Sequence, residues 1–202
     1  MHHKQPGEIG AVKDLLKYLQ HRTGSVRREA YLSGEYKDWK EIPQDIRDQA
    51  LDAQKKWTDR GLGSDRKAIL QQLENWQGRQ VMMRYWVISP DPHLMQHVPE
   101  DKRLEMIARI TDATVHDLYE ANGWGIPQYS HVIHDKTNKE GFPMPHAHIV
   151  TPGTIDLGPH GRIDHFVRKP HIRNLHEISQ AHFEHELENV LGKEDELNGE
   201  GG

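Results

Sequence analysis

Three histidines with the spacing of a metal site stand in the second half of the chain. His146 and His148 belong to residues 145–150, and His134 ends an apolar run that begins at Tyr129. Side chains alternate between the two faces of a strand, so His146 and His148 point the same way if this segment is extended. Neutral imidazole is the commonest side-chain ligand of divalent transition metals. The pattern predicts three protein ligands with open coordination positions, as in catalytic sites.

The connection between the two histidine-bearing segments is rich in residues that form turns. They are Asn138, Gly141, Pro143 and Pro145. This composition predicts that the segments are antiparallel neighbours, an arrangement that brings His134 to the other two histidines. Asp135 follows His134 directly and has two candidate roles. It either hydrogen-bonds a ligand imidazole and fixes its tautomer, or it caps the turn.

These residues resemble the metal motif of the HUH endonucleases, in particular the relaxases of plasmid mobilisation and conjugative transfer. The resemblance is carried by His134-Asp135, the run Pro-His-Ala-His at residues 145–148 and the apolar strand that ends at Pro152-Gly153. This chain departs from the family in two ways. In relaxases the acid stands two residues after the first histidine, and the connection between the two parts of the motif is usually shorter.

The resemblance extends beyond the motif but not along the whole chain. It is fairly continuous over residues 80–192, patchy over residues 12–22 and absent over residues 23–78. It implies an enzyme that nicks and rejoins one DNA strand at a plasmid transfer or replication origin by tyrosine transesterification. Single-stranded origin DNA and accessory mobilisation proteins are the implied partners. The implied cofactor, Mn²⁺ or Mg²⁺, is held by the three histidines and polarises the scissile phosphate.

Tyr18 is the first candidate for the attacking nucleophile, because its segment resembles the tyrosine motif of relaxases. Lys13 and Lys17 stand near it, and such cations hold a phosphate and favour the phenoxide form. Tyr31 is the rival, since its segment resembles the tyrosine segment of another relaxase branch. His21 is a weaker candidate, because some relaxases attack through histidine. All three are far from the metal motif in sequence, so the fold must bring them together with it.

Hydrophobic periodicity predicts the elements that position these residues. Helices are expected over residues 10–21, 43–57, 64–76, 101–122 and 174–191, and strands over 80–89, 129–134, 147–150 and 163–168. The strand at 80–89 is apolar on both faces, which is typical of a central strand. The pattern predicts an α/β (α+β) fold with a mainly antiparallel sheet backed by helices and with N-terminal helices. In this interpretation residues 1–192 form one relaxase-like domain, and residues 193–202 an acidic, disordered tail.

Composition bears on several other classes of protein. The chain of 202 residues has no cysteine, so it has neither disulfides nor a thiolate metal site. No apolar run approaches the roughly 18–20 residues of a membrane span, and the N-terminus lacks the apolar core of a signal peptide. We therefore expect a cytoplasmic protein without a membrane partner. The net charge of −5 is neutral evidence on DNA binding, because acidic residues concentrate near the C-terminus.

Two other functions fit the same residues. A relaxase-like domain without a working nucleophile would bind origin DNA and leave it uncut. An unrelated histidine-coordinated metalloenzyme would use the same ligands for different chemistry. A cupin-like barrel is disfavoured, because Pro152 and Gly153 stand where its glutamate would follow the histidine pair. The number of predicted helices also argues against a barrel.

Overall fold

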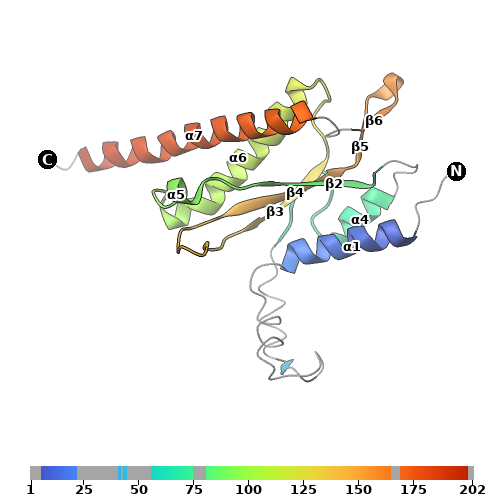
Figure 1. Ribbon diagram of the computed structural model, residues 1–202, viewed down its shortest axis with the longest axis horizontal. Coiled ribbons are helices and arrows are strands. Elements are labelled where there is room, and N and C mark those ends of the chain that lie inside the picture. Colours follow the sequence, from blue (N-terminus) through green and yellow to red (C-terminus); the bar gives the residue numbers. More distant parts are fainter. Residues whose placement is uncertain are drawn as a thin grey trace.

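The centre of the protein is a four-stranded antiparallel sheet between two layers of helices (Figure 1). A computed structural model describes residues 6–21, 41, 43–44, 56–74, 81–164 and 169–199. The strand order is β1-β3-β4-β2, and the strands are β1 (Thr58–Arg60), β2 (Met83–Ile88), β3 (Tyr129–His134) and β4 (His146–Pro152). The predicted α+β class with a mainly antiparallel sheet is confirmed.

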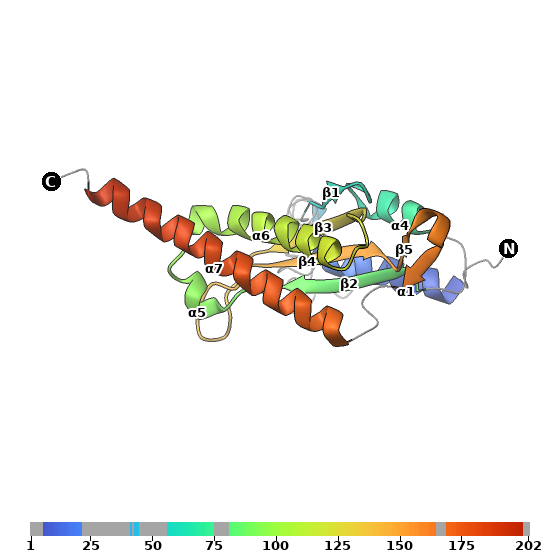
Figure 2. The ribbon, with the colours of Figure 1, turned by 90° about the horizontal axis from the view of Figure 1, so that it is seen from above.

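Helices cover both faces of this sheet. Figure 1 shows α6 (Glu100–Ala121) and α7 (Lys169–Gly199) on one face, and α1 (Pro6–His21) and α4 (Arg66–Glu74) on the other. The shorter elements are α5 (Pro92–Met95), the 3-10 helix η2 (Gly158–His160) and the hairpin of β5 (Thr154–Asp156) with β6 (Arg162–Asp164). Figure 2 shows α7 lying along α6, which it contacts. No helix of the described residues is long and apolar enough to cross a membrane.

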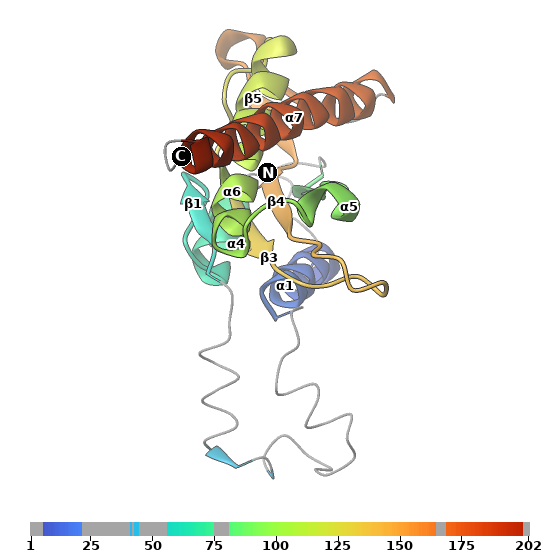
Figure 3. The same ribbon diagram turned by 90° about the vertical axis from the view of Figure 1, so that its left-hand side faces the viewer.

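Alternation along the central strands separates two apolar cores. Val132 and Val150 pack with Leu16 of α1 on one face, whereas Ile149 packs with Ile110 of α6 on the other. Figure 3 shows α1 and α7 on opposite sides of β4. All residues of β4 are buried, as expected for a strand that is covered on both faces. The two faces therefore have separate environments, and each histidine of the sheet belongs to one of them.

β2 is an edge strand, so the prediction of a central strand over residues 80–89 is wrong. Trp86 and Ile88 enter the core under α6, but Tyr85 and Val87 are 38% and 39% exposed on the opposite face. This exposure shows that α1 and α4 leave the β2 edge of that face uncovered. The apolar residues on both faces of β2 predicted that both faces are buried, but only the face towards α6 is buried.

The side chain that caps the N-terminus of α4 is Asp65. A carboxylate oxygen of Asp65 accepts the amide hydrogens of Lys67 and Ala68 at 2.7 and 2.9 Å. Asp is as good an N-cap as Ser, and its negative charge also suits the positive end of the helix. The helix therefore begins later than predicted, at Arg66.

The C-terminal helix is longer than predicted. α7 begins at Lys169 and continues to Gly199, so the backbone is helical through residues 193–199 of the segment for which we expected disorder. The single glycine at 192 costs a helix only about 1 kcal/mol, and the Lys, Glu and Leu residues that follow are strong helix formers. Residues 200–202 lie outside the described part of the chain.

Two further segments differ from the expectation. The helix expected over residues 43–57 lies mostly outside the described residues, and the chain after it forms β1, for which the sequence analysis predicts no strand. The strand expected over residues 163–168 begins one residue earlier as β6, and residues 165–168 are outside the described part. β6 pairs with β5, a strand that the sequence does not predict, because three residues carry too little periodicity.

A polar network on the α6 face ties β1 and β3 to α6. Asp112 of α6 accepts hydrogen bonds from Arg60 of β1 and, at 2.6 Å, from the Tyr129 hydroxyl of β3. Burial alone would raise the pKa of Asp112, but these two hydrogen bonds outweigh it and hold that pKa below its ordinary value. The Arg60 guanidinium and the Tyr129 hydroxyl thus act together to keep the Asp112 carboxylate ionised where α6 meets the sheet.

His131 lies beside this network, on the opposite face of β3 from His134. Its side chain is fully buried, and its Nδ1 stands 3.7 Å from an oxygen of Asp112. Neither ring nitrogen has a hydrogen-bond partner among the described residues. Burial lowers the pKa of His131 to about 4, against the attraction of Asp112. The imidazole is therefore neutral in the folded protein at pH 7.

We predict that His131→Leu makes folding less sensitive to acid. The unfolded chain binds a proton at His131 near pH 6.5, but the folded protein does so only near pH 4. The parent therefore has its full stability above about pH 6.5 and loses about 3 kcal/mol of it as the pH falls towards 4. The variant lacks this loss of stability. Its free energy of unfolding at pH 7 is unchanged or higher, because leucine replaces the two buried ring nitrogens of His131, which have no hydrogen-bond partner among the described residues.

Urea unfolding of both proteins at pH 7 and at pH 4.5 measures this difference. Exposed His116→Leu, on the outer side of α6, is the matched control and should keep the acid sensitivity of the parent. Equal losses of stability in the parent and in His131→Leu would contradict the prediction.

Candidate metal centre

The three predicted ligands come together at one end of the central strand pair. β3 and β4 are antiparallel neighbours, as predicted, and His134 stands directly opposite His146. His148 follows two residues later on the same face. The ring centroids of His134, His146 and His148 are 4.6 to 5.4 Å apart, and all three side chains are buried. One candidate ligand nitrogen from each ring lies within 4.8 Å of the others.

Each imidazole uses one nitrogen to contact a protein oxygen. His134 Nε2 donates to the carbonyl oxygen of Leu19 in α1 at 2.6 Å, and His146 Nδ1 donates to that of Met144 at 2.9 Å. A carbonyl only accepts, so both of these nitrogens carry hydrogen. The lone pair of each ring is then on the opposite nitrogen, His134 Nδ1 and His146 Nε2. Hydrogen bonds of this kind fix the tautomer and orientation of metal-binding histidines.

Tyr85 supplies the equivalent contact to His148, and the sequence analysis missed it. Its hydroxyl lies 2.7 Å from His148 Nδ1, and the two rings are nearly parallel at 5.6 Å between centroids. Because a tyrosine hydroxyl both donates and accepts, this contact permits the tautomer in which Nδ1 carries the hydrogen and the lone pair of His148 is on Nε2, the form that a metal bound at Nε2 would select. The alternation of β2 assigns Tyr85 to a face, but only the strand pairing shows that this face meets His148. No local pattern contains that information.

The donor set fits a divalent transition metal. Three neutral imidazoles suit ions such as Fe²⁺ or Zn²⁺ best and bind Mn²⁺ less tightly, whereas Mg²⁺ requires an oxygen-rich set. No carboxylate is among the three ligands, and three protein ligands leave positions for water or substrate. The residues present therefore fit the predicted Mn²⁺ better than the predicted Mg²⁺.

A second group of potential ligands lies elsewhere, on the outer side of α6. It consists of His116, Asp117 and Glu120, whose ligand atoms also lie within 4.8 Å of one another. All three are exposed, so water competes for any ion there, and exposed groups of this kind commonly bind none. The buried triad is accordingly the stronger candidate, and the exposed group provides an internal control for it.

Asp135 is exposed at the start of the loop after β3. The described contacts of the three ligand rings are made by Leu19, Met144 and Tyr85 instead. The turn itself is organised by Asn138, whose side-chain oxygen accepts the amide hydrogens of Glu140 and Phe142 at 2.9 Å. The two tasks considered for Asp135 are thus carried out, in the described contacts, by other residues.

The structure brings the helix that carries Tyr18 to the triad. Tyr18 precedes Leu19, whose carbonyl oxygen accepts the hydrogen bond from His134, and its side chain is 49% exposed. The last turn of α1 therefore lies against the triad, although more than a hundred residues separate Leu19 from His134 in sequence. Tyr31 lies outside the described residues, and of His21 only the backbone is described.

We predict that the triad binds one divalent transition metal and that the double variant His146→Ala/His148→Ala does not. Calorimetric titration with Mn²⁺ should show one site in the parent, with much weaker binding of Mg²⁺. Affinity should fall as the pH is lowered, because protonated imidazole has no lone pair for the metal. His116→Ala is the control. Loss of the site in His116→Ala, and its survival in the double variant, would show that the ion binds on α6 instead.

We also predict that Tyr85→Phe weakens Mn²⁺ binding by about tenfold without removing the site, because loss of such a supporting contact costs a metal site roughly 10- to 100-fold in affinity. Val87→Ala, at the neighbouring exposed position of the same edge strand, should leave the affinity unchanged. An unchanged dissociation constant in Tyr85→Phe would mean that the hydroxyl does not orient His148.

Comparison with known proteins gives no family for the chain. No protein-family model matches it, and no curated protein matches it either. The function is therefore argued from the site and from the residues that carry the resemblance.

Proposed function

We propose that this protein is a relaxase-type enzyme, which nicks and rejoins single-stranded DNA at a plasmid transfer or replication origin. The observation that carries the proposal is the contact between α1 and the triad. A buried cluster of three histidines on the sheet and a half-exposed tyrosine in the adjoining helical turn are the two components that this chemistry requires. The histidine motif by itself does not predict that the helix carrying Tyr18 contacts the triad.

Each component has a defined task in the proposed reaction. A divalent metal held by His134, His146 and His148 supplies polarisation of the scissile phosphate. The Tyr18 oxygen attacks phosphorus and forms an O–P bond, while the bond from phosphorus to the 3′ oxygen breaks. The phenolic proton passes to solvent, and the 3′ oxygen takes up a proton. The phosphotyrosine link retains the bond energy, so the reverse attack by the 3′ hydroxyl rejoins the strand.

The distribution of charge supports DNA on the face of α1 and α4. The two helices carry four cations, Lys13, Lys17, Arg66 and Lys67, against three acids, Glu8, Asp14 and Glu74, a net charge of +1. The opposite face carries α7, whose acidic residues include Glu184, Glu186 and Glu188. Because local potential rather than net charge attracts a phosphate backbone, the overall charge of −5 does not oppose the proposal.

The edge strand offers a way into the triad. Tyr85 and Val87 of β2 are exposed on the same face as His148, which stands beside Val87 in the sheet register. On the α1 side, by contrast, the Leu19 backbone closes the site against His134. We propose that the scissile phosphate approaches from the β2 edge and that Tyr18 reaches it from the end of α1.

Hydrolysis is the second candidate function, and the ligand set favours it. Three imidazoles with open coordination positions are also the ligands of some hydrolytic zinc sites. In that case water replaces Tyr18 as the attacking group, and the cut strand leaves without attached protein. The two candidates share the metal, so only the fate of the cut end separates them.

We predict that Tyr18→Phe abolishes a covalent protein–DNA adduct while metal binding is retained. The substitution removes only the attacking oxygen from a half-exposed side chain, so the fold is preserved. The protein is incubated with random-sequence single-stranded DNA and Mn²⁺, and adducts that survive denaturant are separated on gels before and after protease treatment. Tyr31→Phe is the matched control and should form adducts as the parent does.

Three other outcomes are distinguishable. Loss of adducts in Tyr31→Phe alone would make Tyr31 the nucleophile. Adducts in both single variants that require the triad would leave His21 as the attacking residue. Cut DNA without any adduct, in parent and variants alike, would establish the hydrolytic alternative.

A further inference from the structure

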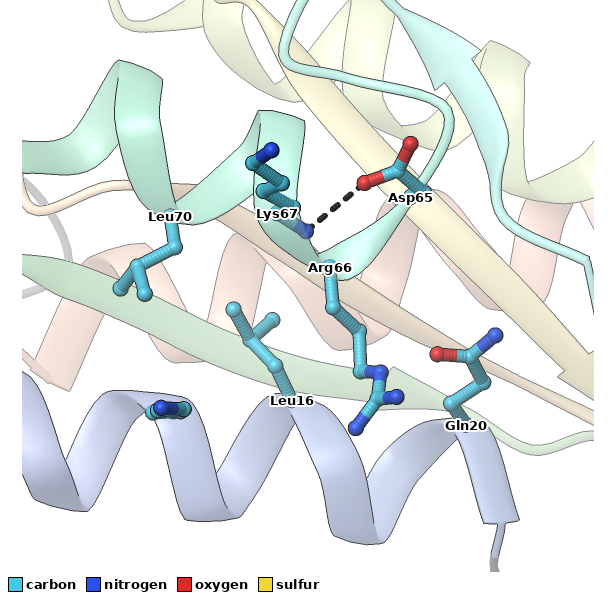
Figure 4. A pocket seen from close by; sticks show the side chains of 7 residues that line it. Leu16, Gln20, Asp65, Arg66, Lys67 and Leu70 are labelled. Atoms are coloured by element: carbon cyan, nitrogen blue, oxygen red, sulfur yellow. Dashed lines mark hydrogen bonds between the residues drawn. The ribbon is translucent and has the colours of Figure 1, made fainter.

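A cleft between α1 and α4 lies on the same face of the sheet as the triad. Its volume is about 450 Å³, within the range of roughly 300–1,000 Å³ for ligand pockets. It is lined by Lys13, Leu16, Gln20, Asp65, Arg66, Lys67 and Leu70. Figure 4 shows Leu16 of α1 and Leu70 of α4 facing each other across the cleft, with the Arg66 side chain extending towards α1 between Leu16 and Gln20.

The lining combines apolar walls with uncommitted positive charge. Lys13, Arg66 and Lys67 are in no ion pair within the described part of the chain, whereas the single acid, Asp65, is engaged as the cap of α4. The backbone amides of Lys67 and Ala68 already donate to the Asp65 carboxylate, so they are not available to an anion. The side chains of Lys13, Arg66 and Lys67 are therefore the groups that attract an anion. The half-buried side chain of Leu70 in turn suits a flat, weakly polar group, and the buried Leu16 forms the floor beneath it.

One end of the cleft lies next to the residue of α1 that contacts the triad. Gln20 lines it, and the preceding residue, Leu19, contacts His134 through its carbonyl oxygen. From Gln20 the cleft follows α1 back to Lys13, two helical turns or about 10 Å away at 1.5 Å per residue. A strand that passes the triad along α1 therefore meets these residues within one or two nucleotides.

We propose that the cleft holds a nucleotide of the single strand next to the site of cutting, which makes this inference rest on the proposed function. The base lies on the half-buried Leu70 side chain, above the core residue Leu16, and its phosphate is bound by Lys13 and Arg66. An unpaired base exposes its face to such a surface, whereas bases of a duplex are stacked on their neighbours and do not enter. The cleft thus selects single-stranded DNA without reading its sequence.

The salt dependence of binding tests the phosphate contacts. A short oligo-dT is titrated with the parent, with Lys13→Gln/Arg66→Gln and with Lys17→Gln, which changes an exposed α1 cation outside the cleft. Each phosphate contact on a single strand contributes about 0.7 to the slope of log affinity against log salt. The double variant should lower that slope by about 1.4, twice that value, and Lys17→Gln by less. Equal slopes in the double variant and the parent would overturn the proposal.

The base contact has a separate test. Leu70→Ala should weaken oligo-dT binding and leave the salt slope unchanged, because it removes apolar contact and no charge. The half-buried position makes folding of this variant secure, and circular dichroism checks it. Unchanged affinity in Leu70→Ala, or equal competition by duplex DNA of the same length, would overturn the placement of a base in the cleft.

Failure of this inference is distinguishable from failure of the proposed function. If the parent forms protein–DNA adducts but the slopes do not differ, the cleft proposal alone falls. If the slopes differ as expected but no adduct forms, the cleft remains a single-strand site and the relaxase proposal falls. The affinity of the triad for Mn²⁺ should be the same in all cleft variants.

Discussion

The register of β3 against β4 is the constraint on which the site depends. Pairing His134 with His146 puts both imidazoles, and His148 two residues on, on one face of the sheet. A slip of one residue would turn the whole of one strand over and separate the ligands. The apolar residues prevent the slip, because Val132 and Val150 must face α1 while Ile149 faces α6. Ordinary packing therefore brings the three histidines together.

Covering the sheet on both faces has a second consequence. On the α1 face, histidines are oriented by hydrogen bonds to Leu19, Met144 and Tyr85. On the α6 face, His131 of β3 has no such partner among the described residues, and burial together with the nearby Arg60 lowers its pKa and keeps it neutral. His131 and His134 of β3 thus have different hydrogen-bonding environments, and the difference follows from the face of the sheet on which each side chain lies.

Local patterns were sufficient for much of the fold and for the ligands. The turn-rich connection predicted the antiparallel pairing of β3 with β4, and helical periodicity located the long helix α6 to within a residue at each end. Both signals lie within the segments themselves. The His-x-His spacing similarly needs only the alternation of a single strand, so that the triad was predictable before its surroundings were known.

Features that depend on distant segments were not predictable. The role of Tyr85 arises from the pairing of β2 with β4, and the edge position of β2 depends on where α1 and α4 end. The contact of Leu19 with His134 joins the N-terminal helix to a strand 115 residues further along the chain. Gly153 shows the same limit: a Cβ there would overlap the backbone of Val81, a neighbour that the sequence around Gly153 does not reveal.

The central claim is that the three imidazoles bind a metal through particular nitrogens, and anomalous diffraction from crystals grown with Mn²⁺ tests it most directly. The account predicts one strong anomalous peak at roughly 2.0–2.3 Å from His134 Nδ1, His146 Nε2 and His148 Nε2, lengths typical of metal–imidazole bonds. Leu19, Met144 and Tyr85 should keep their contacts to the opposite nitrogens. A peak at His116, Asp117 and Glu120 with none at the triad, or a triad whose rings have turned to bind through the other nitrogens, would contradict the account.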